Sequence, residues 1–250
     1  MIPVKKKAGT AELLFKSARK MGLNPVWLTP NGLFVVTTNK GERYVNHEWS
    51  SLNSHISASL ARNKYKTRLI LGRHNLPNIP YSHPRSLDEA IGFLAKHKKI
   101  IVKPLKGSGA VDIHVVSSSD QLAALDIRHC ILEQYVAGKE MRYLVLNGSV
   151  IAVHESKYGE SVDQHRYLER VSYDSTLWDP ELVKMSVKIN GILGLAFSAV
   201  DYIIDDSGRQ YVLEVNSCPG FKWFHAPSEG PVVDVAKLFL EAMVSDTEKR

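Results

Sequence analysis

The sequence contains little cysteine and no long apolar run. Of its 250 residues only Cys130 and Cys218 are cysteines, and their spacing matches no metal-binding pattern. We therefore expect two free thiols in a reducing, cytoplasmic compartment. No apolar run approaches the ~18–20 residues of a membrane helix, and the N-terminus lacks the apolar segment and cleavage site of a signal peptide. We expect no membrane segment and no membrane partner.

The sequence also lacks a concentration of charge. It has 32 lysine and arginine residues against 26 aspartate and glutamate residues, a formal net charge of +6, and the basic residues are scattered. A nucleic-acid-binding protein would need a basic stripe with interleaved aromatic side chains, which the sequence does not show. A mild positive excess suits an anionic small substrate such as a nucleotide. Nucleic acid is therefore not an expected partner.

Hydrophobic periodicity predicts a mixture of helices and short strands in an α+β architecture. Helices are expected over residues 10–21, through most of 51–72, from a capping box at Ser86 to residue 97, over 180–193, and from Pro231 to residue 244. Strands are expected over 25–28, 33–38, 43–46, 99–104, 113–117, 130–134, 140–146 and 150–155. Residues 76–84 are expected to be extended. Residues 157–175 are expected to form a long loop, and loops of that length tend to be functional.

Residues 201–220, DYIIDDSGRQYVLEVNSCPG, predict a β-hairpin that carries polar side chains. Because side chains alternate along a strand, Glu214 and Asn216 share a face, and Asp201 can face them from the partner strand. Two carboxylates and one amide oxygen suit Mg²⁺, which is usually held together with substrate phosphates. Taken alone, the stretch is better explained as a half-solvated hairpin with scattered acids, because short motifs match by chance. The motifs upstream decide between the two interpretations.

The stretch IIVKPLKGSGAVDIHVV, residues 100–116, predicts a strand, a glycine-bearing loop and a second strand. Lys103 at the strand end can meet a polyphosphate while backbone N–H groups of the loop fold over it. The loop residues concerned are Lys106, Gly107, Ser108 and Gly109. No G-K-[ST] follows, so this is not a Walker loop. A plain glycine turn with a solvated lysine is the alternative for this stretch alone.

The stretch ILEQYVAGKEMRYLV, residues 131–145, predicts an apolar strand that runs into a polar end. The candidate binding residues in it are Glu133, Gln134, Tyr135, Val136, Glu140 and Arg142. Exposed backbone groups at the strand end can pair with an adenine edge. Glu140 can accept hydrogen bonds from ribose hydroxyl groups, and Arg142 can meet a phosphate or a carboxylate. An edge strand with a surface salt bridge is the alternative.

In their order along the chain these motifs resemble those of ATP-grasp ligases. The order is Lys64 in NKYKT, Lys103 in VKP, the glycine loop, EQYVAGKE, the DYI strand and EVNSCPG. The resemblance covers about residues 61–244. It is strongest to the branch that holds cyanophycin synthetase, glutathione synthetases and ribosomal-protein glutamate ligases. Residues 110–112, Ala-Val-Asp, depart from the G-R-G common near cyanophycin synthetase, which leaves the donor arrangement of the loop open.

The resemblance implies an ATP-grasp fold, in which two α+β lobes grip ATP. Residues 1–60 would form a short N-terminal lobe, 61–136 the central lobe with the phosphate loop, and 137–250 the C-terminal lobe with the metal site. Lys64 and Lys103 would hold the phosphates, residues 133–136 would form the adenine hinge, and Glu140 would bind ribose. The metal ligands would be Asp201, Glu214 and Asn216. They would hold two Mg²⁺ ions that share Glu214, with Mn²⁺ as the alternative ion.

The resemblance also implies the activity: an ATP-dependent ligase that forms an amide bond through an acylphosphate. Its substrates would be a carboxylate, from an amino acid or peptide, and an amine. Arg142 together with Arg166 or Arg170 would stabilise the acylphosphate, although a solvated loop explains the last two equally well. His154 lies where a substrate could sit. A homo-oligomer is left open. The alternative function is an ATP-binding regulatory module without turnover, which intact lysines and metal ligands argue against.

Overall fold

The structure, a computed structural model, describes residues 9–39, 41–47, 49, 51–107, 111–158 and 167–245. Its helices are α1 (Thr10–Lys20), α2 (His55–Arg62), α3 (Lys64–Arg73), α4 (Leu87–His97), α5 (Ser119–Ala123), α6 (Pro180–Leu193), α7 (Lys222–His225) and α8 (Val235–Ser245), with a 3-10 turn at Ser175–Leu177. Its strands are β1 (Val26–Trp27), β2 (Leu33–Thr38), β3 (Gly41–Asn46), β4 (Tyr81–Ser82), β5 (Ile100–Pro104), β6 (His114–Val116), β7 (Cys130–Gln134), β8 (Lys139–Leu146), β9 (Ser149–Tyr158), β10 (Tyr167–Tyr173), β11 (Phe197–Ile204) and β12 (Gln210–Asn216).

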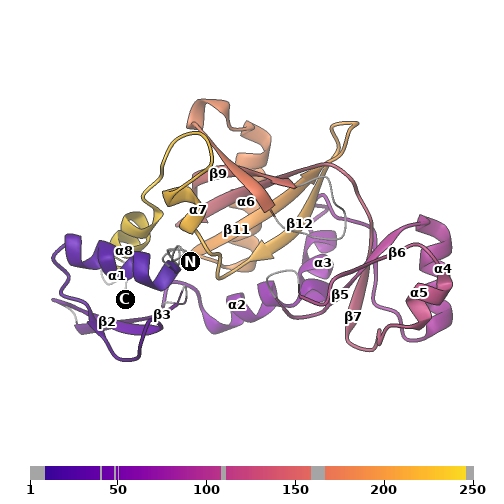
Figure 1. Cartoon of the computed structure of the whole chain (residues 1–250), viewed down its shortest axis with the longest axis horizontal. Coiled ribbons are helices and arrows are strands. Elements are labelled where there is room, and N and C mark those ends of the chain that lie inside the picture. The colour runs from indigo at the N-terminus through magenta and orange to yellow at the C-terminus, as the bar shows by residue number, and fades with distance from the viewer. Residues whose placement is uncertain are drawn as a thin grey trace, which may run out of the picture.

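The strands form three antiparallel sheets, each made from one consecutive part of the chain. Their orders are β1-β2-β3, β4-β7-β5-β6 and β10-β9-β8-β11-β12. The sheets follow one another along the longest axis of the molecule, with the five-stranded sheet between the other two (Figure 1). One sheet falls in each of the three segments expected from the sequence, and the division into lobes itself stays a prediction. No described helix is long and apolar enough to cross a membrane.

The two ends of the described chain pack together on the N-terminal sheet. Leu14 of α1, Phe34 of β2 and Phe239 of α8 are fully buried in one apolar core. The last helix begins at Val235, so the expected start at Pro231 is wrong. Helix α8 is instead capped by Asp234, whose side chain accepts a hydrogen bond from a backbone N–H of the first turn at 3.0 Å. A capping carboxylate satisfies an otherwise unpaired N–H group and therefore decides where the helix starts.

The five-stranded sheet has one apolar face and one mixed face. Alternate residues such as Tyr143, Val200 and Tyr202 point to the apolar face, and they pack with the buried side of α6. On the other face, Leu144 and Ala199 join the N-terminal core. The side chains further along the same strands on this face are polar. These polar positions form the candidate binding site described below.

The predicted loop over residues 157–175 is wrong where the structure describes it. Strand β9 extends to Tyr158, and residues 167–173 form β10, which pairs with β9. Arg170 and Ser172 occupy inward positions of β10 and are only 7% and 4% exposed. Because its inward positions are polar, this strand lacks the apolar alternation that reveals most strands. Residues 159–166, including the candidate Arg166, lie outside the described residues.

Candidate nucleotide and metal site

A row of polar side chains crosses the mixed face of the five-stranded sheet. Its members are direct cross-strand neighbours, one from each strand: Glu214, Asp201, Arg142, His154 and Ser172. Neighbouring strands lie about 4.8 Å apart, so the row spans about 19 Å. A row of this length can contact several groups of an extended ligand at once.

The predicted hairpin is present and brings its acids together. Asp201 lies directly opposite Glu214, and Asn216 lies two residues further along β12 on the same face. The pairing skips Leu213, so β12 carries a β-bulge immediately before Glu214. Burial raises the pKa of Glu214, and the facing Asp201 carboxylate raises it further. A buried carboxylate whose ionisation is opposed in this way fits a site for a divalent cation.

Arg142 is held by one of these acids. Its Nε and Nη2 donate to the two carboxylate oxygens of Asp201 at 2.6 and 2.7 Å, a bidentate pair that fixes the guanidinium plane.

The side-chain oxygen of Asn216 accepts a hydrogen bond from the Cys218 N–H at 2.9 Å. In the described ranges no cluster of three or more His, Cys, Asp or Glu side chains occurs, so the predicted metal set depends on the amide of Asn216 as its third member.

The two predicted phosphate lysines approach this hairpin from the neighbouring sheet and from helix α3. Lys103 extends from β5 and donates to Glu133 at 2.8 Å, whereas Lys64 begins α3 and donates to the Gly107 carbonyl at 3.3 Å. Both ammonium groups lower the pKa of Glu214, opposing its burial, so they lie within electrostatic reach of the metal hairpin. Gly107 has a φ of +151°, which favours glycine there.

Of the remaining loop candidates, Lys106 is described and exposed. Ser108 and Gly109 lie outside the described residues, so the arrangement of loop donors stays a prediction.

The expected exposed strand end at the adenine hinge is partly wrong. Glu133 is 1% exposed and pairs with strands on both sides. The N–H groups of Gln134 and Tyr135 already donate to the carbonyls of Pro80 and Lys99, at 2.9 and 3.1 Å. The Gln134 N–H is in use because the segment before β4 closes the edge of the sheet, and the Tyr135 N–H is in use because the residue before β5 accepts from it. The partner Pro80 comes from residues expected to form an extended loop, so local sequence did not reveal it.

The other two nucleotide candidates flank the start of β8. Val136 lies in the short connection between β7 and β8. Glu140 lies on the same face as Arg142, two residues earlier on β8, and is 6% exposed. Its predicted contact with ribose is compatible with this position and stays a prediction.

The far end of the row is buried but incompletely satisfied. His154 is 2% exposed and stacks on Phe224, with 4.7 Å between ring centroids. Burial lowers the pKa of His154 well below its ordinary value, and the charges of Arg142 and Arg170 lower it further, so the ring is neutral. The two ring nitrogens of His154 have no hydrogen-bond partner among the described residues, and neither does the Ser172 hydroxyl. Buried polar atoms are normally hydrogen-bonded, so these atoms point to an additional ligand or water.

Arg170 is anchored to the segment that follows the metal hairpin. Its N–H donates to the Ser228 hydroxyl at 3.1 Å, and its carbonyl accepts from the Ser228 N–H at 2.8 Å. The guanidinium lies 5.0 Å from the ring centre of Trp223. At Gly230 a Cβ atom would come within 1.9 Å of the Ser172 carbonyl oxygen, so only glycine allows this close approach. The segment therefore fixes β10 and orients Arg170 beside His154.

A model of the RimK-like ATP-grasp domain matches residues 61–243. The chain belongs to the RimK-like ATP-grasp family. It is 27% identical to the tetrahydromethanopterin:α-L-glutamate ligase of Methanocaldococcus jannaschii, over 81% of this chain and 72% of the relative. It is 25% identical to the D-alanine–D-alanine ligase of Buchnera aphidicola (71% and 65%). It is 23% identical to the cyanophycin synthetase of Nostoc sp. (94% and 35%). The chain thus spans between about a third and three quarters of these relatives.

Solved structures confirm the ATP-grasp fold. A bifunctional glutathione synthetase from Pasteurella multocida superimposes with a TM-score of 0.69 at 16% identity, covering 95% of this chain and 44% of that one. The ATP-grasp ligase PsnB, complexed with a minimal precursor, gives a TM-score of 0.65 at 19% identity, covering 78% and 64%. The family uses ATP and Mg²⁺, and its named members here are ligases. The family therefore supports the ligase interpretation over an ATP-binding regulatory module.

Sequence reasoning missed one buried charge in the ATP-grasp site. Arg68 of α3 is 3% exposed and lies between the two sheets that carry the lysines and the acids. A charged residue in a helix is ordinarily read as solvated. The available signal was helical spacing, because Arg68 precedes the buried Leu71 by three residues and therefore lies on the same helix face.

Proposed function

We propose that the protein is an ATP- and Mg²⁺-dependent ligase that joins a carboxylate to an amine through an acylphosphate. The observation that carries this proposal is the order of side chains along the polar row. Two carboxylates lie at one end, within electrostatic reach of Lys64 and Lys103, a bidentate arginine lies in the middle, and unsatisfied polar atoms lie at the other end. The reacting groups of a ligase follow the same order: metal and phosphate, acyl group, amine.

ATP is the first substrate, and the lysines Lys64 and Lys103 would neutralise its phosphates. Asp201, Glu214 and Asn216 would hold the Mg²⁺ ions, whose chemistry is to offset charge on the transferring phosphoryl group. Glu214 is the natural shared ligand because it faces Asp201 across the strands and lies two residues from Asn216 on its own strand. The raised pKa of Glu214 supports this role, since a bound cation would favour its ionised form.

The donor carboxylate would lie beside Arg142. One of its oxygens attacks the γ-phosphorus of ATP, a P–O bond forms, and the bond to the departing ADP breaks. Arg142 is oriented by Asp201 and can donate to the acylphosphate as charge develops on it. Arg170, two strands further along the sheet, would bind a second anionic group of the donor or of the phosphate.

The amine would then attack the acyl carbon at the far end of the row. A C–N bond forms, the C–O bond to phosphate breaks, and inorganic phosphate leaves. The neutral His154 ring is an acceptor for a proton or a hydrogen bond from the attacking amine, and the Ser172 hydroxyl lies next to it in the inter-strand pairing. Both side chains have polar atoms that such a substrate would satisfy.

The substrates we propose are an amino acid or short peptide and an amine. Relatives named as glutamate and D-alanine ligases support an amino-acid substrate, and PsnB in complex with a precursor peptide supports a peptide. Arg142 on the row and Arg170 beside it favour an anionic donor. The absence of a basic stripe in the sequence favours no role for nucleic acid.

The test is release of phosphate from ATP with Mg²⁺, screened over pairs of amino acids and short peptides, with mass spectrometry of the products. A ligase gives a new amide in equal amount to the phosphate released. An ATP-binding regulatory module would bind nucleotide but give no amide with any pair, and that result would reject the proposal.

A further inference from the structure

One arginine connects the two sheets that form the nucleotide site. Arg68 of α3 donates from Nε to the Glu133 carboxylate of the four-stranded sheet at 2.8 Å. From its other two nitrogens it donates to consecutive carbonyls of β12 in the five-stranded sheet, at 2.6 Å to Val212 and 2.8 Å to Leu213. Among the described contacts, this side chain therefore links a carboxylate of one sheet to two carbonyl groups of the other sheet.

On the four-stranded side, the arginine is one step from a phosphate lysine. The other oxygen of Glu133 accepts from Lys103 at 2.8 Å, and the lysine and glutamate side chains are 7% and 1% exposed. Burial alone would raise the pKa of Glu133, but the charges of Arg68 and Lys103 hold it at about 2. Glu133 is therefore a permanent anion whose position is set from both sides, and the position of Lys103 follows from it.

On the five-stranded side, the arginine is one residue from the central metal ligand. Strand β12 lies at the edge of its sheet, and Leu213 is the residue that the β-bulge leaves unpaired. Arg68 donates a hydrogen bond to the carbonyl of this bulge residue, and Glu214 is the next residue along the strand. A bulge re-aims the neighbouring side chain. A donor bound at the bulge therefore helps to fix the direction of Glu214.

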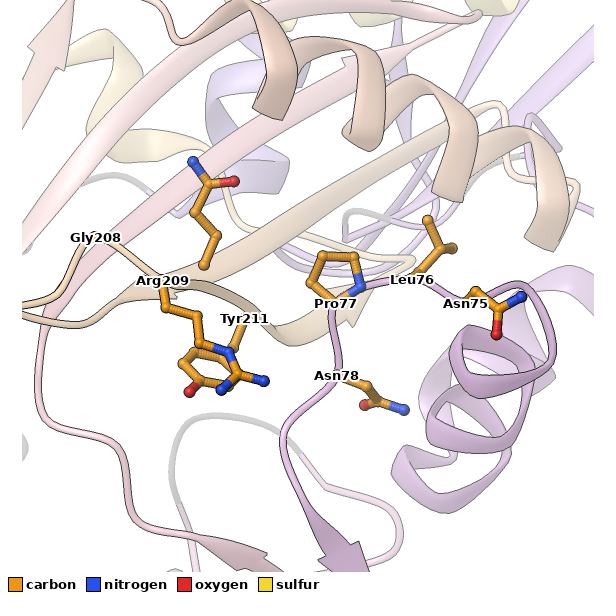
Figure 2. A pocket seen from close by; sticks show the side chains of 8 residues that line it. Asn75, Leu76, Pro77, Asn78, Gly208, Arg209 and Tyr211 are labelled. Carbon is orange, nitrogen blue, oxygen red and sulfur yellow. The ribbon is translucent and has the colours of Figure 1, made fainter.

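The linker after α3 reinforces this connection. Asn78 accepts from Arg68 at 3.1 Å and donates to the carbonyl of the same arginine at 2.9 Å, which orients the guanidinium. The linker runs beside β12, and together they line a shallow polar depression of about 570 Å³ (Figure 2). Asn78 lines this depression with Arg209 and Tyr211. The depression contains none of the predicted site residues, so we assign Asn78 an orienting role and no ligand.

We propose that Arg68 is a positioning residue that sets the spacing between Lys103 and Glu214, so that ATP phosphates and Mg²⁺ bind as a coupled pair. The inference rests on the proposed nucleotide and metal roles of those two residues. Arginine suits the task because its planar guanidinium donates in several fixed directions at once. A lysine would keep the charge opposite Glu133 but could not also reach both carbonyls of β12.

The test compares binding of a non-hydrolysable ATP analogue by calorimetry in Mg²⁺ and in EDTA, for the wild type and Arg68→Lys. The ratio of the two dissociation constants measures the coupling between nucleotide and metal. We expect Arg68→Lys to bind the analogue in EDTA within about twofold of wild type, while the enhancement by Mg²⁺ falls by at least about fivefold, the lower end of typical coupling. Arg73→Lys, an exposed change on the same helix, is the matched control and should leave the enhancement unchanged.

A purely structural role predicts a different result. It would lower the melting temperature and weaken binding equally with and without Mg²⁺, and an unchanged enhancement in folded Arg68→Lys would overturn the proposal. If Arg68→Lys does not fold, Asn78→Ala decides, since it keeps both charges and only releases the guanidinium. We expect a loss of about twofold to threefold in enhancement, and full enhancement would overturn the proposal. Neither measurement needs an amine or a product, so ligase activity can fail while this inference stands.

Discussion

The two ends of the polar row differ in how their polar atoms are satisfied. At one end, both oxygens of Asp201 accept from Arg142, opposite Glu214. At the other end, the ring of His154 and the hydroxyl of Ser172 have no hydrogen-bond partner within the described parts of the chain. At the end proposed to bind the nucleotide, the protein itself therefore satisfies the polar atoms. At the far end, the proposed substrate would complete the hydrogen bonds of His154 and Ser172.

This difference has a physical reason. An ion such as Mg²⁺ and a phosphate chain require charges at fixed positions, and a fixed buried charge needs a partner when the ligand is absent. Glu133, for example, is neutralised by Lys103 and Arg68 in advance. A neutral imidazole carries a smaller penalty when it lacks a partner. The far end can therefore be left open for exchangeable substrates at a modest cost in stability.

The largest expected effect comes from removing the charge of the central metal ligand. Glu214→Gln keeps the size and one oxygen of the side chain but removes the negative charge that the proposed Mg²⁺ ions would share. Metal stabilisation of the transferring phosphoryl group is worth several kcal/mol, and each 1.36 kcal/mol is about tenfold in rate. We expect turnover to fall by at least about a hundredfold, measured as steady-state phosphate release across a Mg²⁺ titration. Near wild-type turnover would remove the hairpin from the metal site.

Circular dichroism should show that Glu214→Gln remains folded. Glu181→Gln, an exposed change on the helix that covers the opposite face, is the matched control and should retain activity. Asn216→Ala should be milder than Glu214→Gln, because water can replace a neutral ligand. Asp201→Asn should fall between the two.

The second expected effect tests whether the nucleotide end is complete without substrate. MgATP alone should stabilise the folded protein, by about 2.7 kcal/mol at a hundred times its dissociation constant. For a chain of this size that corresponds to about 5–10 °C in melting temperature. Amino acids added without ATP should give no comparable shift. Melting curves unchanged by MgATP would contradict a preassembled nucleotide end.

The third expected effect concerns Arg170, which lies on the strand that carries Ser172 at the far end of the row. Arg170→Ala should raise KM for the carboxylate or lower turnover by about tenfold, the value of one charge-assisted hydrogen bond. The KM for ATP should change by less than about twofold. Arg209→Ala, a cation over an aromatic ring outside the row, is the matched control. An equal rise in both KM values would move Arg170 to the nucleotide end.

The hairpin of β11 and β12 was predictable from sequence, and strand β10 was not. Alternating side chains and a polar turn gave the hairpin, so the opposition of Asp201 and Glu214 followed from local geometry. Strand β10 was missed because Arg170 and Ser172 occupy its inward positions and remove the apolar alternation. Polar residues on an inward face can bind a ligand, and the same residues remove the apolar alternation by which a strand is predicted from sequence.

Long-range pairing explains the other errors. The amides at the adenine hinge were expected to be free, but the Pro80 carbonyl and the carbonyl of Lys99 accept from them. Arg68 was missed because its partners Glu133 and Leu213 are 65 and 145 residues away along the chain. Spacing within a helix shows which face a residue occupies, but it does not identify a partner on a distant strand. The roles of the site residues stay predictions until the variants are measured.

The smallest expected effect is a dependence of stability on pH at the far end. His154 is surrounded by Arg142 on β8, Arg170 on β10 and the Phe224 ring of α7, and its pKa in the folded state lies well below the ordinary value of 6.5. As the pH falls below 6.5, the unfolded chain takes up a proton that the folded chain does not. The free energy of unfolding therefore decreases toward acid, by about 1.4 kcal/mol between pH 7.5 and 5.5. His154→Phe, which keeps a ring against Phe224, should lack this contribution. Between pH 7.5 and 5.5 the melting temperature of the wild type should then fall by about 3–5 °C more than that of the variant. The other histidines contribute equally to both proteins, so their contribution to the pH dependence cancels in this comparison. Equal falls in the two proteins would mean that the ring is not held neutral, and the contrast between the two ends of the row would lose its basis.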